Sequence, residues 1–297
     1  MTSRPIATEQ HPTTAPSYKT VQTQSAQVDG TAFAYRDLGP REGIPLILLN
    51  HWGAVLDNFD PRIIEGLASS RRVIAIDYRG IGASGGVAPI TVAEMARDLI
   101  AFIRTLDLGQ VDLLGFSLGG FVAQSVALQA PCLVRRLILT GTGPAGGEGI
   151  GQVGRVSWPL ILKGMLTRRD PKYYLFFTSS STGRQAAQDF LDRLNERTTN
   201  RDKEPTLRAF FRQLRAIRAW GRQAPQDLRN LKIPVLIANG DNDIMVPTEN
   251  SRDLARRFPD STLVIYSDAG HGGIFQYHFE FTRTALDFLE KPAADFY

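Results

Sequence analysis

The sequence contains a single cysteine, Cys132, so the chain cannot form an internal disulfide bond. A lone cysteine fits a reducing compartment, and we expect a cytoplasmic protein. Because Cys132 follows Pro131 at a predicted helix-to-strand junction, we interpret it as a buried structural thiol. No apolar run reaches transmembrane length and the first residues show no secretory signal, so no membrane association is expected.

Three further features are missing. No run of Lys and Arg resembles a nucleic-acid patch, although the formal net charge is +4. No Cys, His and carboxylate residues cluster at metal-site spacing. The glycine-rich residues 77–86 have neither a G-x-G-x-x-G that directly opens a helix nor a Walker lysine. We therefore expect no nucleic-acid partner, no metal and no organic cofactor.

Apolar runs of strand length recur along both halves of the chain. They cover residues 45–49, 72–77, 111–115, 137–141, 234–240 and 262–266, after two shorter strands at 21–28 and 32–37. Runs without polar alternation are typical of strands covered on both faces. Helical segments separate several of them, which predicts an α/β protein with a largely parallel sheet.

The chain is organised around Ser117, which lies in the pattern Gly115-Phe116-Ser117-Leu118-Gly119 between a strand and a helix. A G-x-S-x-G at such a junction places the serine on a sharp turn that exposes its hydroxyl. The flanking glycines suit a close approach of the two backbones. The pentapeptide is common, so by itself it also fits a serine that merely caps a helix.

Together with Leu48–Gly53, Asp77–Ser84 and the loops around Asp243 and His271, this motif resembles the α/β-hydrolase superfamily, in its esterase-like branch. The resemblance covers residues 21–289. It implies an α/β-hydrolase fold, with a mostly parallel central sheet flanked by helices and a helical cap inserted after the sixth strand. Residues 19–145 and 231–291 would form the core, residues 146–230 the cap, and residues 1–18 a mobile tail.

The resemblance also implies a catalytic site. Ser117 would be the nucleophile, His271 the base and Asp243 the acid, in the chain order typical of this fold. Asp241 is the competing acid, and Asp243 fits the family pattern better. The backbone N–H groups of Trp52 and Leu118 would form the oxyanion hole.

Further residues are candidates for the pocket wall. They are His51, Phe116, Trp158, Phe176, Phe177, Met245 and Ile274. His51 stands where the family usually has glycine, so it is expected to structure the loop or contact substrate. The arginines between residues 208 and 222 form either a solvated helix face or a site of attraction for an anionic substrate.

These features predict a serine hydrolase that cleaves a small carboxylic ester or lactone through an acyl-enzyme. A cofactor-free perhydrolase or haloperoxidase and a carbon–carbon bond hydrolase would use the same three residues, so both remain open. So do a ligand receptor of slow turnover and a catalytically silent interaction protein. The oligomeric state is left open.

Overall fold

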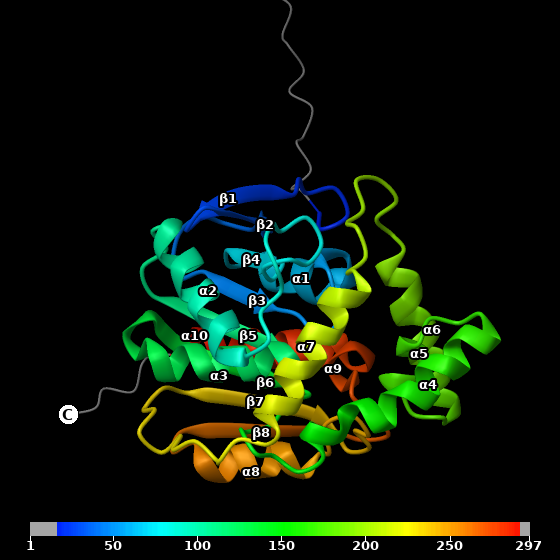
Figure 1. Ribbon diagram of the computed structural model, residues 1–297. Helices are drawn as coiled ribbons and strands as arrows, with labels where there is room; N and C mark the ends of the chain where they lie inside the picture. Colours follow the sequence, from blue (N-terminus) through cyan, green and yellow to red (C-terminus); the bar gives the residue numbers. More distant parts are fainter. Residues whose placement is uncertain (1–16, 292–297) are drawn as a thin grey trace, which may run out of the picture.

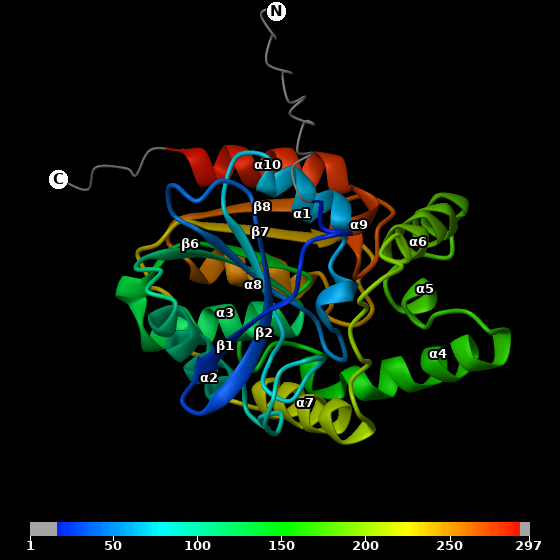
Figure 2. The ribbon, with the colours of Figure 1, turned by 90° about the horizontal axis from the view of Figure 1, so that it is seen from above.

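A computed structural model describes residues 17–291 and shows helices on both faces of a central sheet (Figures 1 and 2). Eight strands pair within this part of the chain in the order β1-β2-β4-β3-β5-β6-β7-β8. They are β1 (Gln24–Val28), β2 (Thr31–Leu38), β3 (Leu46–Leu49), β4 (Val73–Ile76), β5 (Val111–Phe116), β6 (Val134–Thr140), β7 (Val235–Gly240) and β8 (Ser261–Tyr266). Strand β2 runs antiparallel to β1 and β4, and the other neighbours are parallel, as predicted.

The central strands β3, β4 and β5 are buried at every residue, which explains their continuous apolar sequences. Parallel pairing of β3 with β5 sets Leu49 beside Gly115. Because the carboxyl ends of parallel strands meet at one edge, the loop after β3 and the turn after β5 emerge side by side.

Two groups of helices cover the sheet. Helices α1 (Pro61–Ala68) and α10 (His278–Glu290) pack together on one face, and α2 (Val92–Thr105), α3 (Leu118–Gln129) and α8 (Glu249–Arg257) lie on the other (Figure 2). Short helical segments lie between some of these helices and the neighbouring strands. They are the 3₁₀ helix Leu56–Asn58 before α1, the 3₁₀ helix Pro131–Leu133 after α3 and the helix α9 (Gly273–Gln276) before α10.

The chain between β6 and β7 is helical and lies at one side of the sheet (Figure 1). It contains the 3₁₀ turn Ile150–Gln152 and helices α4 (Val153–Thr167), α5 (Lys172–Leu175), α6 (Ser181–Leu194) and α7 (Leu207–Trp220). Side chains of Ser180 and Thr206 cap α6 and α7 by accepting a backbone N–H three residues on.

The arginines of α7 divide into two kinds. Arg208, Arg215 and Arg218 are exposed, which favours a solvated face for them. Arg212 instead donates from Nε to the Ala88 carbonyl oxygen and so fastens α7 to the core.

Two expectations need correction. Cys132 is exposed, because the turn Pro131–Leu133 that carries it buries none of its residues, so the prediction of a buried thiol is wrong. The expected tail, residues 1–18, lies outside the described residues up to position 16. Tyr18 is buried and its hydroxyl donates to the Leu56 carbonyl at 2.7 Å, so the chain has joined the folded body by that residue.

Within residues 17–291, no helix is both long and apolar enough to span a membrane.

Candidate active site

Ser117 lies at the turn between β5 and α3 with φ 56° and ψ −115°, a conformation that non-glycine residues rarely adopt. The Ser117 N–H donates to the Thr140 carbonyl at 2.8 Å, and the Thr142 hydroxyl donates to the Ser117 carbonyl at 2.9 Å. These bonds, to the last residue of β6 and from the segment that follows it, hold the turn on both sides of the serine.

The glycines of the motif are required by close backbone contacts. A Cβ on Gly115 would lie 2.3 Å from the Gly119 carbonyl oxygen, and one on Gly119 would lie 2.1 Å from the Leu49 carbonyl oxygen. Any larger residue would push α3 away from β3 and β5. Glycine therefore lets the helix begin directly against the strands, with Ser117 at their edge.

Asp243 and His271 come from the loops after β7 and β8, and they meet: His271 Nδ1 lies 2.7 Å from Asp243 Oδ2. The other carboxylate oxygen accepts the backbone N–H groups of Met245 (2.8 Å) and Val246 (2.9 Å). Both side chains are buried. The carboxylate is thus fixed by two backbone donors and in turn fixes the imidazole.

Asp241 has a different role. Its Oδ1 accepts the Ala269 N–H at 3.1 Å and the Asn242 side-chain amide at 2.6 Å. It braces the loop that carries His271, and within the described chain its side-chain hydrogen bonds do not include the imidazole. The structure therefore brings Asp243, and not Asp241, to the histidine.

The free nitrogen of His271 faces the cavity that Ser117 also lines. Among the described residues, its Nε2 is buried and has no hydrogen-bond partner. The rings of Phe116 and Phe176 pack against the imidazole, with centroids 4.9 and 5.4 Å away. Because Nδ1 is bonded to Asp243, Nε2 is the nitrogen of this imidazole that can accept a further hydrogen bond.

The loop after β3 carries Trp52 and is held by the helix α7. The Gly53 N–H donates to Gln213 Oε1 at 2.9 Å, and the Trp52 indole donates to the Phe210 carbonyl at 2.8 Å. The Trp52 and Phe210 rings also stack, with centroids 4.2 Å apart. Two side-chain hydrogen bonds therefore join this loop to a helix more than 150 residues later.

Within the described chain, the backbone N–H groups of Trp52 and Leu118 have no hydrogen-bond acceptor. Leu118 is the first residue of α3, where the helix itself supplies no acceptor. The N-terminal end of a helix also carries positive partial charge. Both groups are thus available to a negatively charged oxygen beside Ser117.

His51 is buried and has a defined tautomer. Its Nδ1 lies 2.8 Å from the Trp52 carbonyl oxygen, and because a carbonyl only accepts, Nδ1 carries the hydrogen. Burial, together with the positive charge of Lys172, lowers the His51 pKa to about 3. Within the described residues its Nε2 is buried and has no partner.

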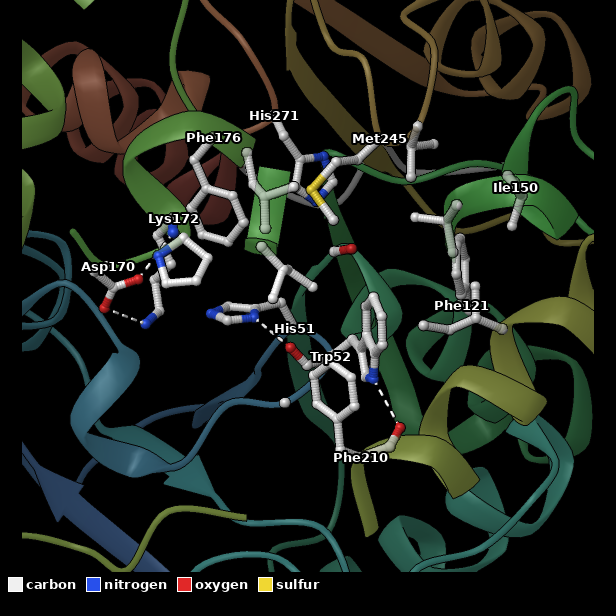
Figure 3. A pocket seen from close by; sticks show the side chains of 18 residues that line it. His51, Trp52, Phe121, Ile150, Asp170, Lys172, Phe176, Phe210, Met245 and His271 are labelled. Carbon is white, nitrogen blue, oxygen red and sulfur yellow. Dashed lines mark hydrogen bonds and ion pairs between the residues drawn. The ribbon is translucent and has the colours of Figure 1, made fainter. Parts of the chain in front are cut away.

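A cavity of about 180 Å³ lies beside Ser117 and His271 (Figure 3). His51, Lys172 and Asp170 lie along one side of it, and Met245 and Ile150 lie on the opposite side. Other apolar residues complete the wall: Phe121, Val153, Ile161, Leu175, Phe176, Phe210, Ile217 and Val246. The cavity therefore suits a small, mostly apolar molecule.

Of the predicted pocket residues, His51, Phe176 and Met245 line this cavity, whereas four others do not. Phe116 lies behind His271, and Phe177 packs against Phe190. Trp158 is partly exposed and stacks on Phe211. Ile274 lines a separate, smaller cavity on the other side of Phe116.

The polar pair Asp170 and Lys172, whose Oδ2 and Nζ lie 2.9 Å apart, could not be recognised from sequence patterns. Both lie at the start of the short helix α5, where helical periodicity is too brief to show which side faces inward. Phe210 and Ile217 belong to a predicted amphipathic helix, but its pattern does not distinguish a pocket wall from the cap interior.

Within the described residues, no group of three or more His, Cys, Asp and Glu side chains is arranged to hold a metal ion.

These features define a class of α/β proteins in which a serine on a strand-to-helix turn shares one sheet edge with a histidine–aspartate pair. The chain belongs to the α/β-hydrolase fold family, since the family model for the alpha/beta hydrolase fold matches residues 44–276, more than half of its length. The sequence-based prediction of this superfamily is confirmed.

This chain is also similar to individual proteins, whose names do not agree on one activity. An alpha/beta hydrolase fold protein from Chitinophaga pinensis shares 37% identity and superposes with a TM-score of 0.88, covering 93% of this chain and 100% of that one. A proline iminopeptidase of Pestalotiopsis fici is 26% identical over 269 residues, 82% of this chain and 91% of that protein. A 2-hydroxy-6-oxononadienedioate/2-hydroxy-6-oxononatrienedioate hydrolase of Escherichia coli is 28% identical over 251 residues, 81% and 83% of the two chains.

Proposed function

We propose that the protein is a serine hydrolase that cleaves a small carboxylic ester or lactone through an acyl-enzyme. The observation that carries this proposal is the 2.7 Å contact between His271 Nδ1 and Asp243 Oδ2, with the unpartnered Nε2 facing the cavity of Ser117. This is the arrangement that an imidazole needs to act as a general base on a serine hydroxyl.

In the proposed mechanism, Ser117 Oγ attacks the substrate carbonyl carbon while His271 Nε2 takes the hydroxyl proton. Asp243 stabilises the imidazolium that forms. The N–H groups of Trp52 and Leu118 donate to the oxyanion, and one such donor contributes about 3–4 kcal/mol in comparable sites. His271 then gives its proton to the leaving alkoxide. Water attacks the acyl-enzyme by the reverse path and releases the acid.

The cavity supports an ester or lactone as the substrate. A peptide with a free amino terminus would need an unpaired carboxylate, and Asp170, the carboxylate of the cavity wall among the described residues, is already paired with Lys172. An alkoxide leaving group needs a single proton, which His271 holds after the first step. We further propose that residues 146–230 act as a cap, a role supported by the contacts of Trp52 and Gly53 with α7.

The experiment measures hydrolysis of p-nitrophenyl esters of short acids and of five- and six-membered lactones by the wild type and by Ser117→Ala. We expect kcat to fall on the order of 10⁴-fold or more in the variant. Ser125→Ala is a matched control, because Ser125 is a buried serine of the same helix α3 that bonds only to Gln129 in the described chain. Unchanged turnover in Ser117→Ala, or no turnover of any ester or lactone by the wild type, would contradict the proposal.

A further inference from the structure

One side of the cavity wall carries a hydrogen-bond acceptor that nothing satisfies within the described chain. The bond from His51 Nδ1–H to the Trp52 carbonyl fixes the tautomer, so Nε2 presents a lone pair. That nitrogen is buried, belongs to a residue that lines the cavity, and has no partner. An unsatisfied buried acceptor is costly, so a ligand group that pairs with it gains a contact that other ligands lack.

The surroundings of His51 hold this acceptor in place. Its ring packs edge-on against Phe116 and Phe176, with centroids 5.6 and 5.1 Å away, so it cannot easily turn. Flipping the ring would also break the bond to the Trp52 carbonyl, which only a protonated nitrogen can make. His51 therefore offers the same lone pair to every molecule that enters.

The imidazole cannot become a donor by taking up a proton at ordinary pH. Burial and the positive charges of Lys172 and of a protonated His271 together lower its pKa to about 3. Asp170 lies in the same part of the wall, but its carboxylate is held by the Lys172 ammonium and backbone N–H at 2.9 and 2.8 Å. His51 thus remains a neutral acceptor.

We infer that this site selects esters or lactones whose acyl part carries a neutral hydrogen-bond donor, a hydroxyl or an amide N–H, that binds His51 Nε2. The inference rests on the proposed function and adds the substrate class to it. Nε2 is buried and unpaired before any substrate binds, so an acyl group whose donor reaches it gains a hydrogen bond, and a donor-free acyl group leaves the acceptor unpaired. Sites that expect a hydrogen bond discriminate strongly against analogues that lack the bonding group.

A carboxylate is the competing polar group, because Lys172 is a cation of the cavity wall. Two features of this corner disfavour it. The Lys172 charge is already neutralised by Asp170, and a carboxylate would set its own lone pairs against that of His51. We therefore expect a neutral donor and not an anion to be preferred.

The test compares p-nitrophenyl esters that differ by one group of similar size, with hydroxyl replaced by methyl. The pairs are 2-hydroxypropanoate with 2-methylpropanoate and 3-hydroxybutanoate with 3-methylbutanoate, and the rate of alkaline hydrolysis corrects for intrinsic reactivity. We expect the corrected kcat/KM of wild type to favour the hydroxyl ester by about tenfold or more in at least one pair.

His51→Phe keeps a ring beside Phe116 and Phe176 but removes the acceptor, and the ratio between paired substrates should fall to about one. His51→Gln returns an acceptor near the position of Nε2 and should restore part of the ratio. Because each ratio is taken within one enzyme, a general loss of activity cancels. In wild type the ratio should stay constant from pH 5 to 8, since His51 stays neutral there.

Equal corrected rates for both members of both pairs in wild type would overturn the inference while leaving ester hydrolysis intact. So would a ratio that survives in His51→Phe, or a preference for the monoester of butanedioic acid that Lys172→Met removes. No hydrolysis of any ester by wild type would instead overturn the proposed function and this inference with it. The wild-type ratios alone decide the matter if His51→Phe does not fold.

Discussion

At the scale of single residues, Ser117 combines a reactive position with an unfavourable backbone conformation. Its φ of 56° with ψ of −115° costs a residue with a Cβ on the order of 1–3 kcal/mol. The bond from the Ser117 N–H to the Thr140 carbonyl and the bond from the Thr142 hydroxyl to the Ser117 carbonyl maintain it. The strained turn keeps the hydroxyl at the sheet edge, and its cost can be measured as a change in the free energy of unfolding.

Ser117→Gly should therefore be more stable than Ser117→Ala by about 1 kcal/mol, the reverse of the order in a helix interior. Both variants lack the hydroxyl, so the comparison isolates the backbone. Urea unfolding followed by circular dichroism measures the difference. Equal free energies of unfolding would show that the turn is not strained.

The assignment of the acid gives a second prediction at this scale. Asp243→Asn keeps the shape but alters the contact with His271 Nδ1, so kcat should fall by roughly 10⁴-fold. Asp241→Asn keeps an oxygen able to accept the Ala269 N–H and should lose less than about tenfold. Ester kinetics on both variants checks this, and losses of equal size would contradict the role given to Asp243.

The sequence predicted these residues because glycine-flanked Ser117 and His271 are local patterns. It could not reveal the state of His51, since the tautomer depends on the Trp52 carbonyl and on rings from β5 and the cap segment. The lone pair of Nε2 is a property of the assembled cavity. Contacts between segments that are distant in the chain produce no periodic pattern in the sequence.

At the scale of elements, α7 supports the loop after β3. Gln213 is fully buried, and its Oε1 accepts the Gly53 N–H beside Trp52. Since Trp52 is proposed to donate to the oxyanion, Gln213 is a positioning residue that acts through the loop. A displacement of the Trp52 N–H weakens binding of the transition state more than it weakens binding of the substrate.

Gln213→Met keeps the side-chain length and removes the acceptor, and kcat should fall by about tenfold or more with a smaller change in KM. Arg215→Met is the matched control, because Arg215 is an exposed residue of the same helix. It should leave both constants within about twofold. A loss in Gln213→Met confined to thermal stability, with kcat unchanged, would refute the positioning role.

The elements themselves were largely predictable. Continuous apolar runs predicted β3, β4, β5, β7 and β8 to within one residue at each end. The run expected at 137–141 missed the start of β6 at Val134, where Arg135 and Arg136 interrupt the apolar sequence. The edge strand expected at 21–28 begins only at Gln24, because buried Val21 belongs to a turn in which its N–H donates to the Ser17 carbonyl. The helical spacing of apolar residues predicted helix α7. It did not predict which residues of α7 contact the loop after β3.

At the scale of the whole molecule, a buried charge cluster joins the cap segment to the core. Asp202, between α6 and α7, and Asp57, after β3, both contact Arg36 Nη2, at 2.8 and 2.7 Å. The two aspartates also exchange backbone bonds: each N–H donates to the other's carboxylate, at 2.8 and 3.1 Å. All three side chains are almost fully buried.

This cluster makes stability depend on pH. Burial and the negative charge of Asp57 raise the Asp202 pKa to about 6, although the positive charge of Arg36 opposes the increase. An unfolded aspartate titrates near about 3.9, so between about pH 4 and pH 6 the folded chain binds more protons at this site than the unfolded chain. The contribution of Asp202 to the free energy of unfolding therefore decreases as pH rises through that window and is constant above it.

Asp202→Asn removes this titration while retaining a polar group of the same size. We expect the free energy of unfolding of wild type, minus that of the variant, to be lower at pH 7 than at pH 4.5. Urea unfolding at the two pH values measures it. Asp227→Asn is the control, because Arg229 lowers the pKa of exposed Asp227, so Asp227 stays ionised at both pH values and its difference should change little between them. A difference for Asp202 that instead rises with pH would mean that Arg36 outweighs burial, and that the cluster strengthens the join between cap and core at neutral pH.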